Sequence, residues 1–382
     1  MEGPKGYRET FGESDGSDEV VIKINDPALD WKIPLNPELH AAEAYMDGTL
    51  EVVQGDVYDF LTVFYRNRRQ FDRTPGQVFW QGLSRKLRRF QQHNSITSAR
   101  AHVKHHYDLK DELFELFLDE DKQYSCAYFK TGNETLEEAQ TAKRRHIINK
   151  LNLKDGQSVL EIGCGWGGLA LDIASRANVK VTGVTLSENQ ARIANQRAKD
   201  AGVDDRVKFI LKDYRDVEEV YDRVVSVAML EQVGAYNLKE YFFNIRNRLA
   251  PNGVAMVHSI STKSPPGITG PFIRKYIFPN GYSPALSEIV AAVELSGLWT
   301  LDVEVWRRHY GYTLREWRNR FDANRDQAVA MYDEKFARMW EFYLAACEGV
   351  FMHGSSNVVH LQLGREADGV PLTRDYLYNQ DA

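Results

Sequence analysis

The regular alternation of β-rich and helical segments after about residue 156 constrains the fold more than any other feature of the chain. Short apolar runs with β character follow one another at 157–168, 178–187, 205–214, 222–231 and 253–261. The segments between them, for example 187–202 and 238–253, have the pattern of helices. Strands that alternate with helices predict a parallel, doubly wound α/β sheet with right-handed crossovers.

Later segments extend this prediction. Two further β-rich runs, at 299–306 and 357–364, would complete a seven-stranded sheet, and a long helical pair is expected between them, over 313–351. An insertion rich in Pro, Gly and aromatic residues follows the fifth run, at about 262–285. Ligands of such sheets bind beyond the carboxyl ends of the strands. We therefore expect this insertion to be a lid over the site.

The first β-rich run ends in a glycine turn. Gly163 and Gly165 would let the backbone approach a ligand closely, and the helix that follows offers N–H groups at its positive end. With Gly168 the spacing also fits G-x-G-x-x-G, the pattern of dinucleotide-binding proteins. The motif alone is weak, so a dinucleotide and a fold without a ligand both remain alternatives.

Acidic and polar residues near the strand ends favour S-adenosylmethionine instead. Glu161 lies just before the glycine turn, where it can reach the amino-acid end of that ligand. The second strand ends near Thr185 and Gln190 rather than at an acid that would bind a nicotinamide ribose. After the third strand, Asp213 can accept a hydrogen bond from an adenine amino group, and Tyr214 can stack on the ring. The combination indicates a methyltransferase.

The length and composition bound the domain organisation. A chain of 382 residues suggests two domains, and 43% hydrophobic with 27% charged residues is typical of a globular protein. We expect a flexible N-terminus at 1–19, a small domain at 20–72, a basic amphipathic linker at 73–100 and a catalytic domain at 101–382. Within the small domain we expect a strand at 19–25, a loop and two short helices.

Cysteine usage and the N-terminal residues indicate the compartment. The chain has three cysteines and no CxxC pair, which argues against disulfides and zinc and favours a reducing cytoplasm. Residues 1–19 are acidic and lack the apolar stretch of a signal peptide, and no apolar run approaches the length of a spanning helix. We therefore expect a cytoplasmic protein.

The net charge of -6 conceals a basic region at 66–104, which has ten Lys and Arg residues against a single acid, Asp72. Such a region predicts a polyanionic partner, either nucleic acid or an anionic membrane. Aromatic and aliphatic residues share one face of the helix expected there, which favours a membrane surface. No base-reading motif accompanies it, so we expect no nucleic-acid binding. The alternative is a helix that packs on its own protein with the arginines solvated.

Several motifs together resemble one family. They are HYDLKDELFELFLDEDKQYSCAYF (106–129), VLEIGCGWGGLA (159–170), LKDYRD (211–216), MLEQVG (229–234), IRKYIFPNG (273–281) and, in the small domain, AEAYMDG (42–48). Together they closely resemble the cyclopropane-fatty-acyl-phospholipid synthases and the related mycolic acid methyltransferases. The resemblance implies a seven-stranded Rossmann-like methyltransferase sheet with a small N-terminal lipid-binding domain.

The same resemblance implies an activity and its setting. The expected reaction is methylene transfer from S-adenosylmethionine to the cis double bond of an unsaturated acyl chain in a membrane phospholipid. The expected protein is a homodimer attached peripherally to the inner face of the cytoplasmic membrane. Family cofactor contacts match Tyr107, Ser125, Gly163, Gly165, Thr185, Gln190 and Asp213, and Tyr124 is expected to face the methyl donor with Ser125.

In this family a bound bicarbonate ion is thought to be the base that removes a proton from the transferred methyl group. Cys126 and Ile260 match positions that bind this ion through the backbone. Glu231, His258 and Tyr310 match its side-chain ligands. We hypothesise that Glu231 accepts the bicarbonate hydroxyl proton. Cys126 is thus expected to be a small residue in a tight turn, because no local group would activate its thiol.

One residue departs from the family pattern. Gln232 stands where the family usually has His after the glutamate. The change is either neutral or marks a branch that forms a methyl- or methylene-branched acyl product instead of a ring. A catalytically inactive lipid-surface binding protein and a soluble small-molecule methyltransferase are further alternatives. His105 and His106 lack a third ligand at a suitable spacing, so we expect no metal.

Overall fold

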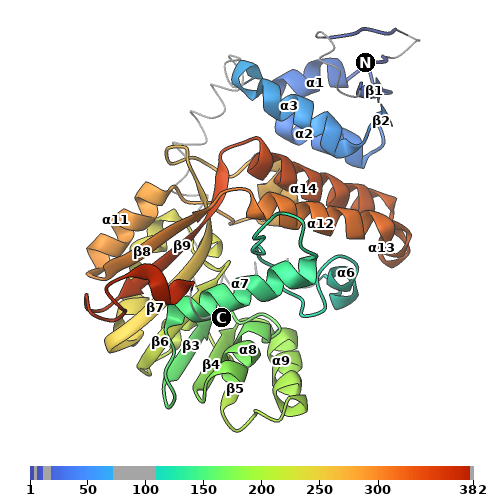
Figure 1. Cartoon of the computed structure of the whole chain (residues 1–382). Coiled ribbons are helices and arrows are strands. Elements are labelled where there is room, and N and C mark those ends of the chain that lie inside the picture. Colours follow the sequence, from blue (N-terminus) through green and yellow to red (C-terminus); the bar gives the residue numbers. More distant parts are fainter. Residues whose placement is uncertain (4–6, 12–18, 72–108, 379–382) are drawn as a thin grey trace.

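The computed structural model describes residues 1–3, 7–11, 19–71 and 109–378. Its main feature is a seven-stranded sheet of order β5-β4-β3-β6-β7-β9-β8, which confirms the predicted α/β fold (Figure 1). The strands are β3 (Ser158–Ile162), β4 (Lys180–Thr185), β5 (Val207–Leu211), β6 (Tyr221–Val227), β7 (Leu249–Thr262), β8 (Trp299–Trp306) and β9 (Ser356–Gly364). Five strands run parallel from β5 to β7, whereas β9 is antiparallel to both of its neighbours.

Helices cover both faces of the sheet. On one face lie α7 (Leu136–Leu151), α8 (Gly168–Arg176) and α9 (Glu188–Asp200), and on the other lie α10 (Leu238–Arg248) and α11 (Leu286–Ser296). Because both faces are covered, the central strands β3 and β6 are buried on both sides, and their burial does not alternate. The carboxyl ends of these strands therefore form the free edge at which a ligand can bind.

Helix α7 supplies two buried lysines to the site side of the sheet. It begins at a capping box, in which Thr135 Oγ1 accepts from the N–H of Glu138 and the Glu138 carboxylate accepts from the N–H of Thr135. It ends at Asn152, which adopts a left-handed conformation. Lys143 and Lys150 are seven residues apart, so they lie on one face, two turns from each other.

Three helices rather than the predicted pair separate β8 from β9. They are α12 (His309–Ala323), α13 (Arg325–Met331) and α14 (Glu334–Met352). The break falls at Asn324, whose side-chain amide donates to Leu116 O and Arg320 O and so ends the first helix. With α6 (Asp111–Glu115), these helices enclose an aromatic core above the sheet.

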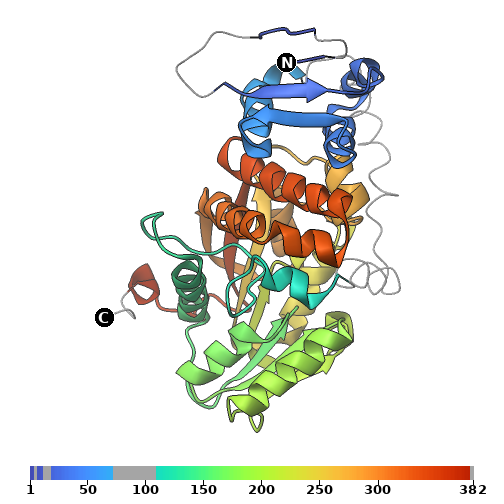
Figure 2. The ribbon, with the colours of Figure 1, turned by 90° about the vertical axis from the view of Figure 1, so that its right-hand side faces the viewer.

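The N-terminal elements form a small unit that packs on α14 (Figure 2). They are β1 (Val21–Ile24), α1 (Leu29–Leu35), α2 (Pro37–Met46), β2 (Leu50–Gln54) and α3 (Val57–Phe71), with β1 and β2 antiparallel. The hydroxyl of Tyr45 donates to Glu341 of α14 at 3.1 Å, and that of Tyr65 donates to Ala346 O at 2.9 Å. These two bonds attach α2 and α3 to the catalytic part of the chain.

Two N-terminal elements differ from the prediction. The segment expected to be a loop contains α1, with Pro34 inside its last turn, and β2 was not foreseen. Within the segment expected to be flexible, the backbone N–H of Glu2 donates to Ile22 O, so this residue pairs with β1. The basic linker 73–100 lies outside the described residues, as does almost all of the basic region 66–104.

Candidate active site

A cavity of about 190 Å³ lies at the carboxyl ends of β3, β4, β5 and β6. Eight residues expected to contact the cofactor line it: Tyr124, Ser125, Gly163, Gly165, Thr185, Gln190, Asp213 and Tyr214. The ninth, Tyr107, lies outside the described residues. Residues from four strand ends and from the segment before α7 thus meet around one space, which we call the donor cavity.

The glycine turn forms the floor of the donor cavity. Gly163 and Gly165 have φ angles of +79° and +52°, in the left-handed region that other residues rarely adopt. A Cβ atom at Gly165 would meet no atom within 4 Å, so the turn needs this glycine for its backbone angle and not for lack of space. The backbone N–H of Gly163 donates to Val184 O at 2.9 Å and holds the turn against β4.

Two buried ionisable groups line one end of the donor cavity. Glu161 Oε2 is buried without a hydrogen-bond partner among the described residues, and burial raises the pKa of this carboxyl to about 8. Lys143 donates to Gln123 Oε1 at 2.6 Å and to Ser125 Oγ at 2.8 Å, and burial lowers its pKa to about 8. A carboxyl and an amine on one wall suit a ligand with an amino-acid end, because the carboxyl can pair with an ammonium group and the amine with a carboxylate.

Sequence reasoning missed Lys143, because a lysine within a helix usually faces solvent. The only available signal was its position among apolar helix residues, on the face that packs against the sheet. The structure buries it, and it fixes the hydroxyl of Ser125 at the cavity wall.

Polar pairs line the other end of the donor cavity. Thr185 Oγ1 donates to Gln190 Oε1 at 2.9 Å. The carboxylate of Asp213 accepts from Nε and Nη2 of Arg215 at 2.9 and 2.8 Å. Arg215, which also lines the cavity, was not expected there, and the adenine contact assigned to Asp213 stays a prediction. Tyr214 packs edge-on against a second tyrosine, with its ring largely buried.

A second and much larger cavity, of about 2020 Å³, adjoins the first. It lies between the N-terminal elements, α12, α14 and the segment 264–283, within the insertion expected to be a lid. The shared lining residues of the two cavities are Tyr124, Ala228 and Gln232. Glu231, Ile260 and Tyr310 line the second cavity, which we call the acceptor cavity.

Glu231 lies beside the junction of the two cavities. It follows β6 in a short helical turn, η3 (Leu230–Gln232), and is buried. Its Oε1 accepts from the backbone N–H of Ile260 at 2.5 Å, whereas Oε2 has no partner among the described residues. Burial raises the pKa of this carboxyl to about 7. The N–H expected to bind an anion at Ile260 is therefore engaged by Glu231 in this structure.

Aromatic rings surround the same junction. Tyr124 stacks on Trp317 with ring centroids 5.2 Å apart, and Tyr310 packs edge-on against the same tryptophan at 5.8 Å. The hydroxyls of Tyr124 and Tyr343 are 2.8 Å apart. Burial raises the pKa of Tyr310 far above its usual value, so its hydroxyl stays protonated. The junction thus offers several π faces, which attract positive charge.

Cys126 and His258 do not line either cavity. Cys126 is fully buried, its thiol donates to Ala127 O at 3.3 Å, and burial raises its pKa well above the usual value. The thiol is therefore unreactive, in agreement with the sequence interpretation. His258 is buried in β7, with Nδ1 2.8 Å from Nε2 of His360.

One group of side chains in the described part of the chain has the geometry to surround a metal ion. The ligand atoms of His146, Glu304 and His360 lie within 4.8 Å of one another. Lys150 Nζ, however, is 2.5 Å from Glu304 Oε2 and 3.3 Å from His360 Nδ1. The ammonium group lies among these atoms and already supplies a positive charge. We therefore interpret the group as an internal ion pair.

The sheet order, the left-handed glycine turn and a donor cavity at the strand ends define a class I S-adenosylmethionine-dependent methyltransferase. Comparison with known proteins specifies the family. The family described as mycolic acid cyclopropane synthetase matches residues 94–361, and a domain of unknown function matches residues 4–75. The chain belongs to the mycolic acid cyclopropane synthetase family.

Individual relatives agree with this assignment. The chain is 35% identical over 373 residues to a protein of Pseudomonas putida named "Probable fatty acid methyltransferase", which covers 95% of this chain and 92% of the relative. It is 37% identical over 351 residues to the cyclopropane-fatty-acyl-phospholipid synthase of Escherichia coli, covering 88% and 85% respectively.

A solved structure of the mycolic acid cyclopropane synthase CmaA1, complexed with SAH and CTAB, has 31% identity and a TM-score of 0.66. The match covers 69% of this chain and 98% of that one. The protein is thus an enzyme that uses S-adenosylmethionine as its methyl donor.

Proposed function

We propose that this enzyme transfers a methylene group from S-adenosylmethionine to the cis double bond of unsaturated acyl chains in membrane phospholipids, giving cyclopropane fatty acids. The observation that carries the proposal is the junction of the two cavities at Tyr124, Ala228 and Gln232. The donor cavity is small and polar-walled at its ends, whereas the acceptor cavity is large and mostly apolar. A large, mostly apolar cavity such as the acceptor cavity suits a long apolar acceptor.

The residues at the donor cavity bind and orient the methyl donor. Glu161 and Lys143 fit its ammonium and carboxylate groups, and the glycine turn allows its close approach. S-Adenosylmethionine, when bound, supplies an electrophilic methyl group. An alkene is a weak nucleophile, so the alignment of the two reactants and the exclusion of water supply much of the rate enhancement.

Positive charge develops on the acyl chain as the alkene attacks the methyl group. Tyr124, Tyr310 and Tyr343 line the acceptor cavity, and each such ring contributes about 0.5–2 kcal/mol of attraction to a cation that lies against its face. The protonated hydroxyl of Tyr310 leaves this residue neutral and adds a hydrogen-bond donor. The aromatic group therefore stabilises the charge without trapping it by a covalent bond.

A base must then remove a proton from the transferred methyl group so that the ring closes. Bicarbonate, when bound, would supply this base. The buried Glu231 Oε2, which lacks a partner among the described residues, fits a hydroxyl donor such as bicarbonate carries. With its pKa raised to about 7, Glu231 can accept that hydrogen bond as a carboxylate near neutral pH.

We further propose that the N-terminal elements hold the enzyme on the cytoplasmic face of the membrane. The large apolar side chains Trp31, Leu35 and Val63 are 60%, 49% and 51% exposed. Leu35 and Val63 also line the acceptor cavity, so they form part of its rim. No helix among the described residues has the length and apolar content to span a membrane. In this proposal the attachment is peripheral, and a homodimer would have two such sites.

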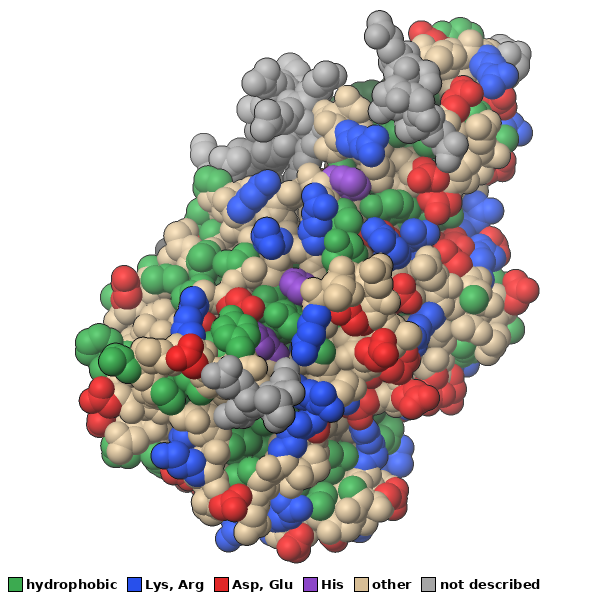
Figure 3. Space-filling view, in the orientation of Figure 1, with side chains coloured by type: hydrophobic (Ala, Val, Ile, Leu, Met, Phe, Trp, Pro, Cys, Tyr) green, Lys and Arg blue, Asp and Glu red, His purple; other side chains and the backbone are tan. Residues whose placement is uncertain are grey.

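Charged and apolar side chains lie together on the surface beneath these elements. Figure 3 shows Lys and Arg side chains beside hydrophobic ones over the middle of the molecule, below the N-terminal unit. Basic residues near an anionic leaflet add about 1 kcal/mol each to binding. Aromatic and basic side chains together are typical of a protein that binds reversibly at the membrane interface.

A branched product is the second candidate. Gln232 lines both cavities at the point where donor and acceptor would meet. A neutral amide in place of a titratable imidazole changes the groups that receive protons there. The relative from Pseudomonas putida carries the name of a fatty acid methyltransferase, which agrees with either product.

The test is mass spectrometry of lipids from cells that lack such an enzyme and express this chain. A gain of one CH₂ on unsaturated phospholipid chains supports the proposal, and NMR of the product distinguishes a ring from a branch. Cells expressing the Glu231→Gln variant provide the control. Unchanged lipids, together with methylation of a polar metabolite, would contradict the proposal.

A further inference from the structure

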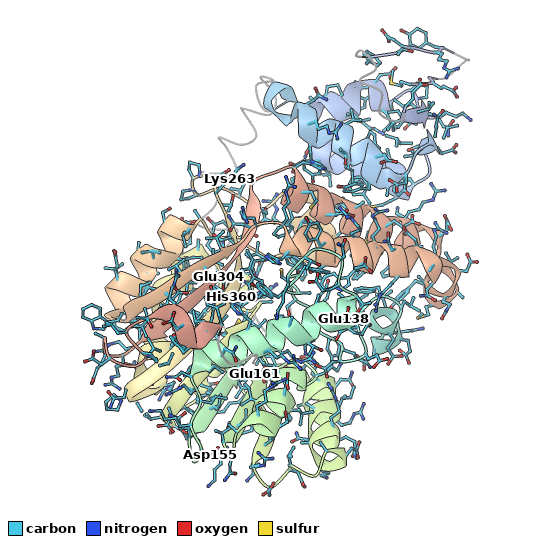
Figure 4. All side chains as sticks on the ribbon, in the orientation of Figure 1. Glu138, Asp155, Glu161, Lys263, Glu304 and His360 are labelled. Carbon is cyan, nitrogen blue, oxygen red and sulfur yellow. The ribbon has the colours of Figure 1, made fainter. Side chains whose placement is uncertain are left out.

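A row of polar side chains, two of them fully buried, crosses three neighbouring strands. Glu304 of β8 is paired with His360 of β9, and His360 is paired with His258 of β7. Directly opposed residues of neighbouring strands project to the same face of a sheet. Figure 4 shows Glu304 and His360 next to each other above α7. The register of the sheet thus places Glu304, His360 and His258 in one row, with His258 at its end.

Lys150 of α7 completes this row. Its ammonium nitrogen is 2.5 Å from Glu304 Oε2 and 3.3 Å from Nδ1 of His360. The other ring nitrogen of His360, Nε2, is 2.8 Å from Nδ1 of His258. Lys150, His360 and His258 are each at most 1% exposed, so the hydrogen bonds between them are shielded from water. We call Lys150, His360 and His258 the tautomer relay.

The direction of each hydrogen bond in the relay follows from chemistry. An ammonium group can only donate, so Nδ1 of His360 must accept from Lys150. A neutral imidazole with an accepting Nδ1 carries its proton on Nε2, which then donates to Nδ1 of His258. By the same rule the proton of His258 lies on Nε2. Burial lowers the pKa of both imidazoles well below the usual value, so both are neutral.

We propose that Lys150, acting through His360, fixes His258 as a neutral imidazole whose proton lies on Nε2, the ring nitrogen directed away from His360. The assignment of His258 to the reaction rests on the proposed function, but the tautomer does not. Nε2 of His258 makes no hydrogen bond with the residues that the structure describes. This N–H is therefore left to donate to an oxygen of a bound anion or substrate.

His258 and Glu231 would then have different hydrogen-bonding roles in the site. An imidazole that presents Nε2–H cannot take the proton of the transferred methyl group, because it has no free lone pair on that side. Toward a bound anion, Glu231 Oε2 would accept a hydrogen bond and His258 would donate one, and neither residue would take the methyl proton itself. Lys150 and His360 are positioning residues, and Glu304 keeps the buried ammonium charged by pairing with it.

The test uses the full chain labelled with ¹⁵N-histidine, with S-adenosylhomocysteine added as the ligand. Imidazole ¹⁵N shifts distinguish the two neutral tautomers, and substitution of single histidines assigns the signals. We expect Nε2–H tautomers at His258 and His360. The His360→Gln variant should keep the tautomer of His258 and most of the turnover. Its amide oxygen can accept from Lys150 while its NH₂ group donates to His258.

His360→Leu, of similar size, breaks the relay at the same position. The tautomer of His258 should no longer be fixed, and turnover should fall about 10- to 100-fold, the usual range when the outer partner of a functional histidine is lost. His146→Gln is the matched control, because His146 contacts Glu304 from outside the relay. It should leave the His258 tautomer unchanged.

Two results would overturn the inference. One is an Nδ1–H tautomer at His258 in the unsubstituted enzyme, and the other is equal behaviour of His360→Gln and His360→Leu in both readouts. If circular dichroism shows that His360→Leu does not fold, Lys150→Met replaces it and should convert His258 to Nδ1–H. An enzyme with the expected tautomers but no lipid product would refute the proposed function and leave the relay intact.

Discussion

Replacement of Glu231 by Gln should abolish turnover and, at alkaline pH, make the folded protein more stable. Burial holds the pKa of Glu231 at about 7, compared with 4.5 for an exposed glutamate. At about 1.4 kcal/mol for each pH unit, this difference corresponds to about 3 kcal/mol in the free energy of unfolding. The wild-type enzyme carries this cost whenever Glu231 is ionised in its buried position.

The sign follows from proton linkage. Because the folded-state pKa is raised, the folded protein binds this proton more tightly than the unfolded chain does. The stability that results is fully present below about pH 4.5 and is lost as the pH rises through about 7. Gln has no such proton. Any cost of its unpaired amide is the same at every pH, so it cancels when two pH values are compared.

The assay is urea unfolding of the wild type and of Glu231→Gln at pH 5 and pH 8, with turnover measured on unsaturated phospholipid vesicles. The difference in unfolding free energy should shift in favour of the variant by about 2.5 kcal/mol between the two pH values, since part of the full difference is already lost at pH 5. Wild-type turnover should rise through about pH 7 as Glu231 ionises. Glu294→Gln, on the exposed side of α11, is the control and should show neither effect. A variant that keeps wild-type turnover, or a stability difference independent of pH, would refute the reasoning.

Three further predictions concern single positions. Cys126→Ser should keep most of the turnover, whereas Cys126→Phe should not, because the site is fully buried; loss of all activity in the serine variant would mean that the thiol takes part in the reaction. Gly165→Ala should weaken binding of S-adenosylmethionine about 5- to 30-fold in calorimetry, since a φ of +52° costs an alanine about 1–2 kcal/mol; unchanged affinity would contradict this. Trp31→Ser, at an exposed position of α1 outside the lining of the acceptor cavity, should reduce sedimentation with anionic vesicles and leave turnover on detergent-dispersed lipid unchanged, and equal sedimentation of variant and wild type would argue against attachment through α1.

The sheet and the donor cavity could be predicted because their signals are local. Each strand of the parallel sheet is a short apolar run, and the glycine turn needs residues that tolerate a positive φ. The residues expected at the cofactor, apart from Tyr107, follow strand ends or precede α7, and parallel topology brings strand ends to one edge. Sequence order and topology therefore suffice to place these side chains near one another.

The buried lysines could not be predicted in this way. Lys143 and Lys150 look like ordinary surface residues of a helix, and only the packing of α7 on the sheet buries them. The opposition of Glu304, His360 and His258 depends on the register of antiparallel pairs with β9, which no local pattern specifies. The helix α1 was missed because Asp26, Pro27 and Pro34 are typical of a loop.

The rim and the junction of the acceptor cavity come from different parts of the chain. The exposed Leu35 and Val63 belong to the N-terminal unit, whereas Ala228 and Gln232 follow β6. The span between them is set by how α2 and α3 pack on α14, through Tyr45 and Tyr65. The length of the cavity would then set which part of an acyl chain reaches the methyl donor. A chain that enters at the rim would place its double bond at the junction only if that bond lies at the corresponding distance along the chain. We expect the enzyme to select lipids by the position of unsaturation, and changes at the contacts with α14 to alter which carbon atoms are modified.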